Sequence, residues 1–192
     1  MPTLTVIAGP NGSGKSTLTS SIWFEGSANL IDPDAIARRL DAAQPARKAI
    51  PAAREAILRC NALLVDGASF TLETTLAGHG AMGILRQAKS AGYQTVLVYV
   101  SLGDPELHIE RVRLRVSQGG HDIPDTDIRR RYWRSLQQAP DALRMVDEAV
   151  VLDNSGIHPV RTLLLSGGRI VWLADTLPEW VQRLAEQFGQ GS

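Results

Sequence analysis

The sequence has few residues that could form cross-links or metal clusters. Its 192 residues contain a single cysteine, Cys60, so no disulfide can form within the chain. The four histidines are scattered and never fall at the spacing of zinc ligands, and we therefore expect no zinc site. Because Cys60 shares one face of a helical pattern with Ile57 and Leu64, we expect it to lie in the core.

The chain also lacks net charge and long apolar runs. Twenty basic residues balance twenty acidic ones, so no overall field attracts nucleic acid or an anionic membrane. The longest apolar stretch, around Thr95–Leu102, is too short to span a bilayer. The first residues carry no basic segment typical of a secretory signal. We therefore expect a cytoplasmic protein that binds neither nucleic acid nor membrane.

Lysine is scarce, whereas arginine is abundant. The chain has three lysines against seventeen arginines, and eight of these arginines lie between Arg111 and Arg144. Arginine suits bidentate contacts with phosphate and carboxylate. A solvated helix surface would explain the same cluster, so its meaning depends on the other motifs.

With 44% apolar and 21% charged residues, the composition is that of an ordinary globular protein. Predicted strands and helices alternate along the chain. Such alternation predicts an α/β fold with a mostly parallel sheet between helices, a three-layer sandwich formed by one domain over residues 1–192. Strands are expected at about 3–8, 30–31, 69–72, 94–101 and 149–152, and helices at about 16–24, 33–40, 52–66, 81–91, 105–118 and from 125 onwards.

The C-terminal part predicts a different arrangement. Two apolar runs, Thr162–Leu165 and Arg169–Ala174, are separated by Ser166-Gly167-Gly168 and are typical of a β-hairpin. Thr176 and Glu179 have the spacing of a capping box, which would open a last helix. We therefore expect a terminal hairpin and helix beyond the parallel sheet.

A glycine-rich segment connects the first predicted strand with the first predicted helix. It reads Gly9-Pro10-Asn11-Gly12-Ser13-Gly14-Lys15-Ser16-Thr17 and matches the pattern G-x-x-x-x-G-K-[ST] in full. In such a loop the backbone N–H groups surround phosphates, Lys15 bridges the terminal phosphates, and the Ser16 hydroxyl is a ligand of Mg²⁺. We therefore predict a P-loop NTPase fold that binds ATP through residues 9–17, with Mg²⁺ as cofactor.

Two aspartates follow the second predicted strand, at the edge where parallel sheets bind ligands. Asp32-Pro33 is typical of a helix N-cap followed by proline, and Asp34 lies in the first helical turn. A kinase needs a carboxylate that accepts the proton of the attacking hydroxyl, and Asp34 is the better placed of the two. Alternatively, both aspartates merely complement the helix dipole.

Glu73, Thr74 and Thr75 follow the next predicted strand and should reach the same edge. Together they offer hydrogen-bond donors and acceptors to a polar substrate, although an ordinary strand-to-helix turn would have a similar composition.

The arginine cluster flanks a glycine-containing loop at about 117–125. Arg111 and Arg115 are four residues apart and share one helix face, and Arg130 lies on the helix that follows the loop. A mobile loop between arginine-bearing helices is typical of a lid that closes over ATP and stabilises the transferred phosphoryl group.

These motifs, in this order, resemble the zeta-toxin family of P-loop kinases. The resemblance covers the chain from Thr3 to Ser155. It is carried by the segments Ala8–Thr17, Ile31–Asp34, Leu72–Gly78, Arg111-Val112, Arg115-Val116, Gly119–Pro124, Ile128–Tyr132 and Asp153–Ser155.

The resemblance implies an enzyme that transfers the γ-phosphate of ATP to the 3′-hydroxyl of the amino sugar in UDP-N-acetylglucosamine. It assigns Asp34 as the catalytic base and Glu73 with Thr75 as substrate contacts. It assigns Arg111 as one nucleotide clamp, with Arg115 or Arg130 as the second. A protein antitoxin is a partner that the resemblance also implies. Two alternatives stay open: a kinase for another small molecule, and a nucleotide-binding switch with slow ATP turnover.

Overall fold

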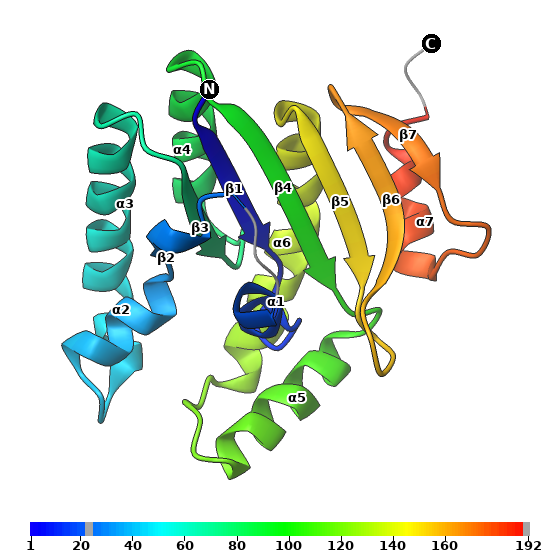
Figure 1. The fold of residues 1–192 in the computed structure, drawn as a ribbon. Coiled ribbons are helices and arrows are strands. Elements are labelled where there is room, and N and C mark those ends of the chain that lie inside the picture. Colours follow the sequence, from blue (N-terminus) through cyan, green and yellow to red (C-terminus); the bar gives the residue numbers. More distant parts are fainter. Residues whose placement is uncertain (22–24, 190–192) are drawn as a thin grey trace.

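The protein folds around a seven-stranded sheet, seen in the computed structural model of Figure 1, which describes residues 1–21 and 25–189. The strands are β1 (Thr3–Ala8), β2 (Leu30–Ile31), β3 (Phe70–Thr74), β4 (Gln94–Ser101), β5 (Glu148–Asp153), β6 (Val160–Ser166) and β7 (Arg169–Leu173). The α-helices are α1 (Lys15–Ser21), α2 (Pro33–Leu40), α3 (Ala49–Val65), α4 (Gly80–Ser90), α5 (Pro105–Ser117), α6 (Asp125–Met145) and α7 (Glu179–Glu186). Short 3₁₀ turns occur at Ser27–Asn29 and Pro45–Lys48.

The strand order is β2-β3-β1-β4-β5-β6-β7. The first five strands of this order pair in parallel, whereas β6 and β7 add to β5 as an antiparallel hairpin. The predicted α/β sheet and the predicted terminal hairpin are both confirmed, and Gly167-Gly168 form the hairpin turn.

Helices cover the two faces of the sheet unequally. In Figure 1, α4, α6 and α7 lie behind the sheet, whereas α1 lies in front of the lower ends of the central strands. Alternate residues of β4, such as Leu97 and Tyr99, are fully buried against the rear helices, and their neighbours Val96 and Val98 are half-buried on the other face. This alternation follows from the two-residue period of a strand. Cys60 is fully buried, as expected for a core residue.

Two helices begin with an N-cap aspartate followed by proline, the pattern predicted for Asp32-Pro33. The side chain of Asp32 accepts a hydrogen bond from the Asp34 N–H at 2.8 Å, and Asp104 accepts one from the Glu106 N–H at 2.9 Å. Each cap satisfies one of the N–H groups that a helix start leaves without a partner. The interpretation of Asp32 as a helix cap is therefore confirmed.

Several element boundaries differ from the predictions. Strand β3 runs to Thr74, so Glu73 and Thr74 are its last residues rather than part of the following turn. No capping box forms at Thr176, because Leu177 precedes a proline and is pushed out of helical geometry, and α7 begins at Glu179. The predicted end of the first helix, at Phe24, lies outside the described residues.

Within the described ranges, no helix combines the length and the apolar character that crossing a bilayer requires.

The buried face of β4 should carry much of the stability. We expect Leu97→Ala to lower the free energy of unfolding by about 2–5 kcal/mol, because it leaves a cavity beneath the helices. Urea denaturation followed by circular dichroism measures this change. Leu58→Ala is the matched control, since Leu58 is 68% exposed, and it should change stability by less than about 0.5 kcal/mol. Equal effects of the two variants would contradict this assignment of the core.

Candidate active site

The phosphate-loop sequence, residues 9–17, folds as the turn between β1 and α1. Gly9 has φ of 147°, and a Cβ atom there would lie 1.9 Å from the carbonyl oxygen of Val100. Gly12 has φ of 77°, and a Cβ atom there would lie 2.6 Å from the carbonyl oxygen of His108. Both positions therefore require glycine, for conformation and for space. The loop packs tightly against the end of β4 and against α5.

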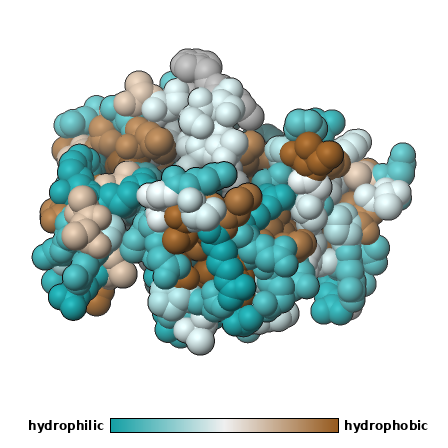
Figure 2. Space-filling view, turned by 90° about the horizontal axis from the view of Figure 1, so that it is seen from below, coloured by the Kyte–Doolittle hydropathy of each residue, from teal (hydrophilic) through white to brown (hydrophobic). Residues whose placement is uncertain are grey.

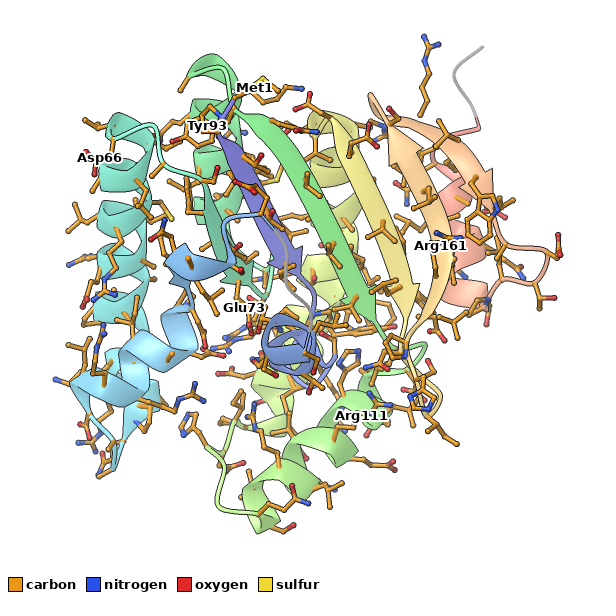
Figure 3. All side chains as sticks on the ribbon, viewed as in Figure 1. Met1, Asp66, Glu73, Tyr93, Arg111 and Arg161 are labelled. Carbon is orange, nitrogen blue, oxygen red and sulfur yellow. The ribbon has the colours of Figure 1, made fainter. Side chains whose placement is uncertain are left out.

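Lys15, Ser16 and Glu73 meet beneath this loop. The pairing of β1 with β3 places Ile7 opposite Glu73, so that the carboxylate reaches the start of α1. The Ser16 hydroxyl donates a hydrogen bond to Oε1 of Glu73 at 2.9 Å, and Nζ of Lys15 donates one to the Pro10 carbonyl oxygen at 3.0 Å. In Figure 3, Glu73 lies at the end of β3 beside α1.

Burial dominates the electrostatics of this charged pair. Desolvation lowers the pKa of Lys15, and the nearby Glu73 carboxylate opposes this shift. Desolvation raises the pKa of Glu73, and the Lys15 ammonium opposes it in turn. Each charge therefore helps the other to stay ionised in a site from which water is largely excluded.

The oxygen atoms of Ser16 and Glu73 fit Mg²⁺. A hydroxyl and a carboxylate are hard ligands of the kind that Mg²⁺ prefers, and in nucleotide sites the ion usually keeps water and takes phosphate oxygens as well. In the part of the chain that the structure describes, no group of three or more His, Cys, Asp or Glu residues could enclose a metal by itself. The arrangement thus suits an ion that is bound jointly by protein and nucleotide.

A cavity of about 560 Å³ opens beside the phosphate loop. Its walls are the loop and the start of α1 on one side, and α5 with the segment after β5 on the other. Arg111, labelled in Figure 3, lies on α5 and donates a hydrogen bond to the Gly156 carbonyl oxygen at 3.1 Å. Arg115, one turn later, donates one to the His121 carbonyl oxygen at 2.8 Å. Both guanidinium-bearing residues line this cavity, which we call the donor cavity.

A second cavity of about 320 Å³ lies on the other side of Lys15, towards α3 and α4. Small residues from these helices, including Ala53 and Gly80, form one wall, and Thr74 and Thr75 form part of the floor. The opposite wall carries arginines from α6. These are Arg130, Arg131 and Arg134. We call this space the acceptor cavity.

The two cavities meet at three charged residues. Lys15, Asp34 and Glu73 line both of them. Asp34 lies in the first turn of α2 and is exposed, so its carboxylate is accessible to bound molecules. Figure 2 shows the molecule from this end, where hydrophilic residues are interspersed with hydrophobic patches. Lys15 and the carboxylates of Asp34 and Glu73 therefore lie at the boundary between the phosphate loop and the second cavity.

The chain turns sharply after β3. Leu76 has φ of 54°, and within the described ranges it is the one non-glycine residue with a positive φ. Its side chain is fully buried, and its N–H donates to the Thr74 hydroxyl at 3.1 Å. A bulky residue in this conformation costs energy that the surrounding packing must offset. The turn brings Thr75 and Ala77 into the wall of the acceptor cavity.

The structure brings most of the candidate residues to one region but separates the arginines. Arg111 and Arg115 line the donor cavity, whereas Arg130 lines the acceptor cavity and forms an ion pair with Asp127 at 2.9 Å. Sequence reasoning gave no role to Asn154, whose side chain donates to the Ser13 carbonyl oxygen at 2.9 Å. It also missed His108, because no motif marks a histidine that contacts a loop 97 positions earlier in the chain.

The mostly parallel sheet and the phosphate loop define the α/β P-loop NTPase fold that the sequence predicts. Residues 4–143 match the family model described as an AAA domain, and the chain belongs to this family. It is also similar to an uncharacterized protein of Haemophilus influenzae, with 34% identity over 126 residues that cover 65% of this chain and 88% of that protein.

Solved structures share the fold at low sequence identity. The AvrRxo1-ORF1:AvrRxo1-ORF2 complex with sulphate ions has a TM-score of 0.74 and 15% identity, covering 96% of this chain and 64% of that chain. This chain thus spans less than two thirds of that protein. A structure of the PezAT toxin-antitoxin system of Streptococcus pneumoniae has a TM-score of 0.61 and 15% identity, covering all of this chain and 80% of that chain.

His108 makes the pH dependence of stability predictable. Its ring is fully buried between the phosphate loop and the end of β4, and burial lowers its pKa to about 4. The unfolded chain, with a histidine pKa near 6.5, therefore binds more protons between these values, and stability should fall as the pH drops from about 6.5 to about 4. The loss that His108 contributes should be on the order of 3 kcal/mol.

Urea unfolding of the wild type and of His108→Asn at several pH values measures this contribution. Carboxylates titrate in the same range in both proteins, so the difference between the two curves isolates the histidine. If the free energy of unfolding changed with pH equally in the two proteins, His108 would make no contribution to the pH dependence of stability.

Proposed function

We propose that the protein is a Mg²⁺-dependent kinase that transfers the γ-phosphate of ATP to a hydroxyl group of a small molecule. The observation that carries this proposal is the sharing of Lys15, Asp34 and Glu73 by the donor and acceptor cavities. A switch that only binds and hydrolyses nucleotide needs no second cavity on the far side of its phosphate loop.

On the donor side, backbone N–H groups of the phosphate loop, which Pro10 lacks, bind the phosphates, and Lys15 neutralises charge on the terminal ones. Ser16 and Glu73, joined by a hydrogen bond of 2.9 Å, hold Mg²⁺ together with the nucleotide. The positive charge of an ion held there would offset negative charge on the phosphates.

Asp34 is the proposed catalytic base. Its carboxylate accepts the proton of the acceptor hydroxyl while the hydroxyl oxygen forms a bond to the γ-phosphorus. The bond from this phosphorus to the β–γ bridging oxygen breaks, so that ADP leaves with the electron pair. Lys15, at the same boundary, stabilises the charge that develops on the transferred group.

Arg111 and Arg115 are the proposed clamps on the nucleotide. Both line the donor cavity from α5, and four-residue spacing places them on one helix face. Arg115 also holds the 117–125 loop through the His121 carbonyl oxygen, so closure of this loop as a lid and the position of the clamp would change together.

The acceptor that we propose is a UDP-sugar such as UDP-N-acetylglucosamine. Arg130, Arg131 and Arg134 give the acceptor cavity a cationic wall that suits a diphosphate. Glu73, Thr74 and Thr75, which also line this cavity, offer hydrogen bonds to sugar hydroxyls. Fold similarity to the PezAT toxin-antitoxin system supports the further proposal of an antitoxin as a protein partner.

Substitution of the proposed base tests the mechanism. We expect Asp34→Asn to lower kcat by about 10²–10⁴-fold, because an amide cannot accept the proton, while ATP binds with nearly unchanged affinity. Mass spectrometry of UDP-N-acetylglucosamine incubated with ATP, Mg²⁺ and each protein detects the phosphorylated product. Calorimetry measures the affinity for ATP.

Lys15→Ala serves as the control, and it should weaken both ATP binding and transfer. Full activity of Asp34→Asn would overturn the assignment of the base. Wild-type protein that binds ATP without phosphorylating this sugar would overturn the proposed acceptor, and a panel of hydroxyl-bearing metabolites would then separate another kinase from a switch.

The metal assignment has its own test. Because a neutral amide attracts a cation less than a carboxylate, we expect Glu73→Gln to raise the Mg²⁺ concentration needed for half-maximal ATP binding about tenfold or more. Titration of Mg²⁺ at fixed ATP, followed by calorimetry, measures this shift. Glu148→Gln, at an exposed position outside both cavities, is the matched control. An unchanged Mg²⁺ dependence in Glu73→Gln would remove Glu73 from the metal site.

A further inference from the structure

Asn11 occupies a position of the phosphate-loop motif that accepts any residue, yet it is 2% exposed and bonded through both of its oxygen atoms. Its carbonyl oxygen accepts a hydrogen bond from Nδ1 of His108 on α5 at 2.7 Å. Its side-chain oxygen accepts one from Nη1 of Arg131 on α6 at 3.1 Å. Two helices, distant in the sequence from the loop, thus contact the same residue.

The hydrogen bonds of His108 define its tautomer. Nε2 accepts a hydrogen bond from the Leu102 N–H at 3.3 Å, so the proton of the neutral ring is on Nδ1 and is donated to Asn11. The ring therefore joins the phosphate loop to the residue that follows β4. Gly12 lies directly against α5, because a Cβ atom at Gly12 would lie 3.2 Å from Cγ2 of Val112.

Helices α5 and α6 form a unit with a hydrophobic cluster of its own. Ile109 and Val112 from α5 pack with Ile123 and Ile128, and this cluster is separate from the main core. The unit carries Arg111 and Arg115 towards the donor cavity and Arg131 towards the acceptor cavity. Its contacts with Asn11 are therefore a direct link between these arginines and the loop that holds the phosphates.

Arg131 has few competing partners. None of the ion pairs found within residues 1–21 and 25–189 involves it, whereas neighbouring Arg129 and Arg130 are both paired with carboxylates. The side-chain oxygen of Asn11 is thus the contact that orients its guanidinium, and the planar group holds the loop in return.

We propose that His108 and Arg131 are positioning residues that hold the phosphate loop, through Asn11, in the shape that binds nucleotide. The proposal goes beyond the proposed kinase reaction, because it concerns nucleotide affinity and requires no acceptor. A loop held in advance loses less conformational freedom when phosphate binds, so release of either contact weakens binding.

A double-mutant cycle on MgADP affinity tests the Asn11 to Arg131 contact. Asn11→Ala and Arg131→Gln should each raise the Kd about five- to tenfold, and the double variant should bind as weakly as the single variants, because both changes remove the same bond. The matched control is Arg129→Gln, on the same helix as Arg131; it breaks an exposed pair with Glu106 of α5 and should leave the Kd within about twofold. Multiplicative effects of the two substitutions, or no effect of either, would overturn the link.

His108 is tested by a pair of variants that separate positioning from stability. His108→Asn keeps an N–H near the place of Nδ1, whereas His108→Phe fills the space and removes the hydrogen bonds of the ring with Asn11, Leu102 and Ser101. We expect His108→Phe to raise the Kd for MgADP at least about tenfold and His108→Asn less than about threefold, even where both melt at lower temperature than the wild type. Affinities that simply follow melting temperature would assign His108 a structural role alone.

The two proposals fail in different ways. If no phosphorylated sugar forms, the proposed acceptor is wrong, but the MgADP affinities still test the link through Asn11. If Asn11→Ala and Arg131→Gln multiply each other's effect on the Kd for MgADP, the link is wrong, but the proposed kinase reaction is unaffected. If His108→Phe does not fold, the cycle between Asn11 and Arg131 decides the proposal.

Discussion

The parallel pairing of β1 with β3 is the constraint on which the site depends. Its register places Ile7 opposite Glu73 and Ala8 opposite Thr74, so the carboxylate lies beside the loop that leaves β1. The carboxyl ends of parallel strands share one edge of the sheet, and ligands bind there. A slip of one residue would direct Glu73 to the other face and remove the hydrogen bond from Ser16. The two cavities are then formed by the helices and loops that lie on either side of this pair of strands.

Burial of opposite charges is the second feature that organises the site. Lys15 and Glu73 are both shielded from water, and each favours the ionised form of the other. A single buried charge would carry a large desolvation cost, whereas a pair reduces it and remains available to phosphates and to a cation. The strained turn at Leu76 and the separate cluster of α5 and α6 then place polar groups around this pair.

Local rules predicted much of the molecule. The motif of residues 9–17 identified the phosphate loop, since a lysine and a hydroxyl at this spacing have few other uses. The cap at Asp32 and the turn at Gly167-Gly168 were also predictable, because each depends on neighbours a few residues away. The capping box at Thr176 was wrongly predicted, because the steric effect of Pro178 on Leu177 outweighs the hydrogen bonds that the box would form.

The sequence by itself determined the class of fold, the phosphate loop and the group of polar residues at the carboxyl edge, because strand periodicity and motif spacing are local properties. Only the tertiary structure decided how the arginines divide between two cavities, that Glu73 bonds with Ser16, and that His108 and Arg131 meet at Asn11. These arrangements depend on strand register and on the packing of helices around separate cores. Contacts between residues 57 to 120 positions apart leave no periodic signal in the chain.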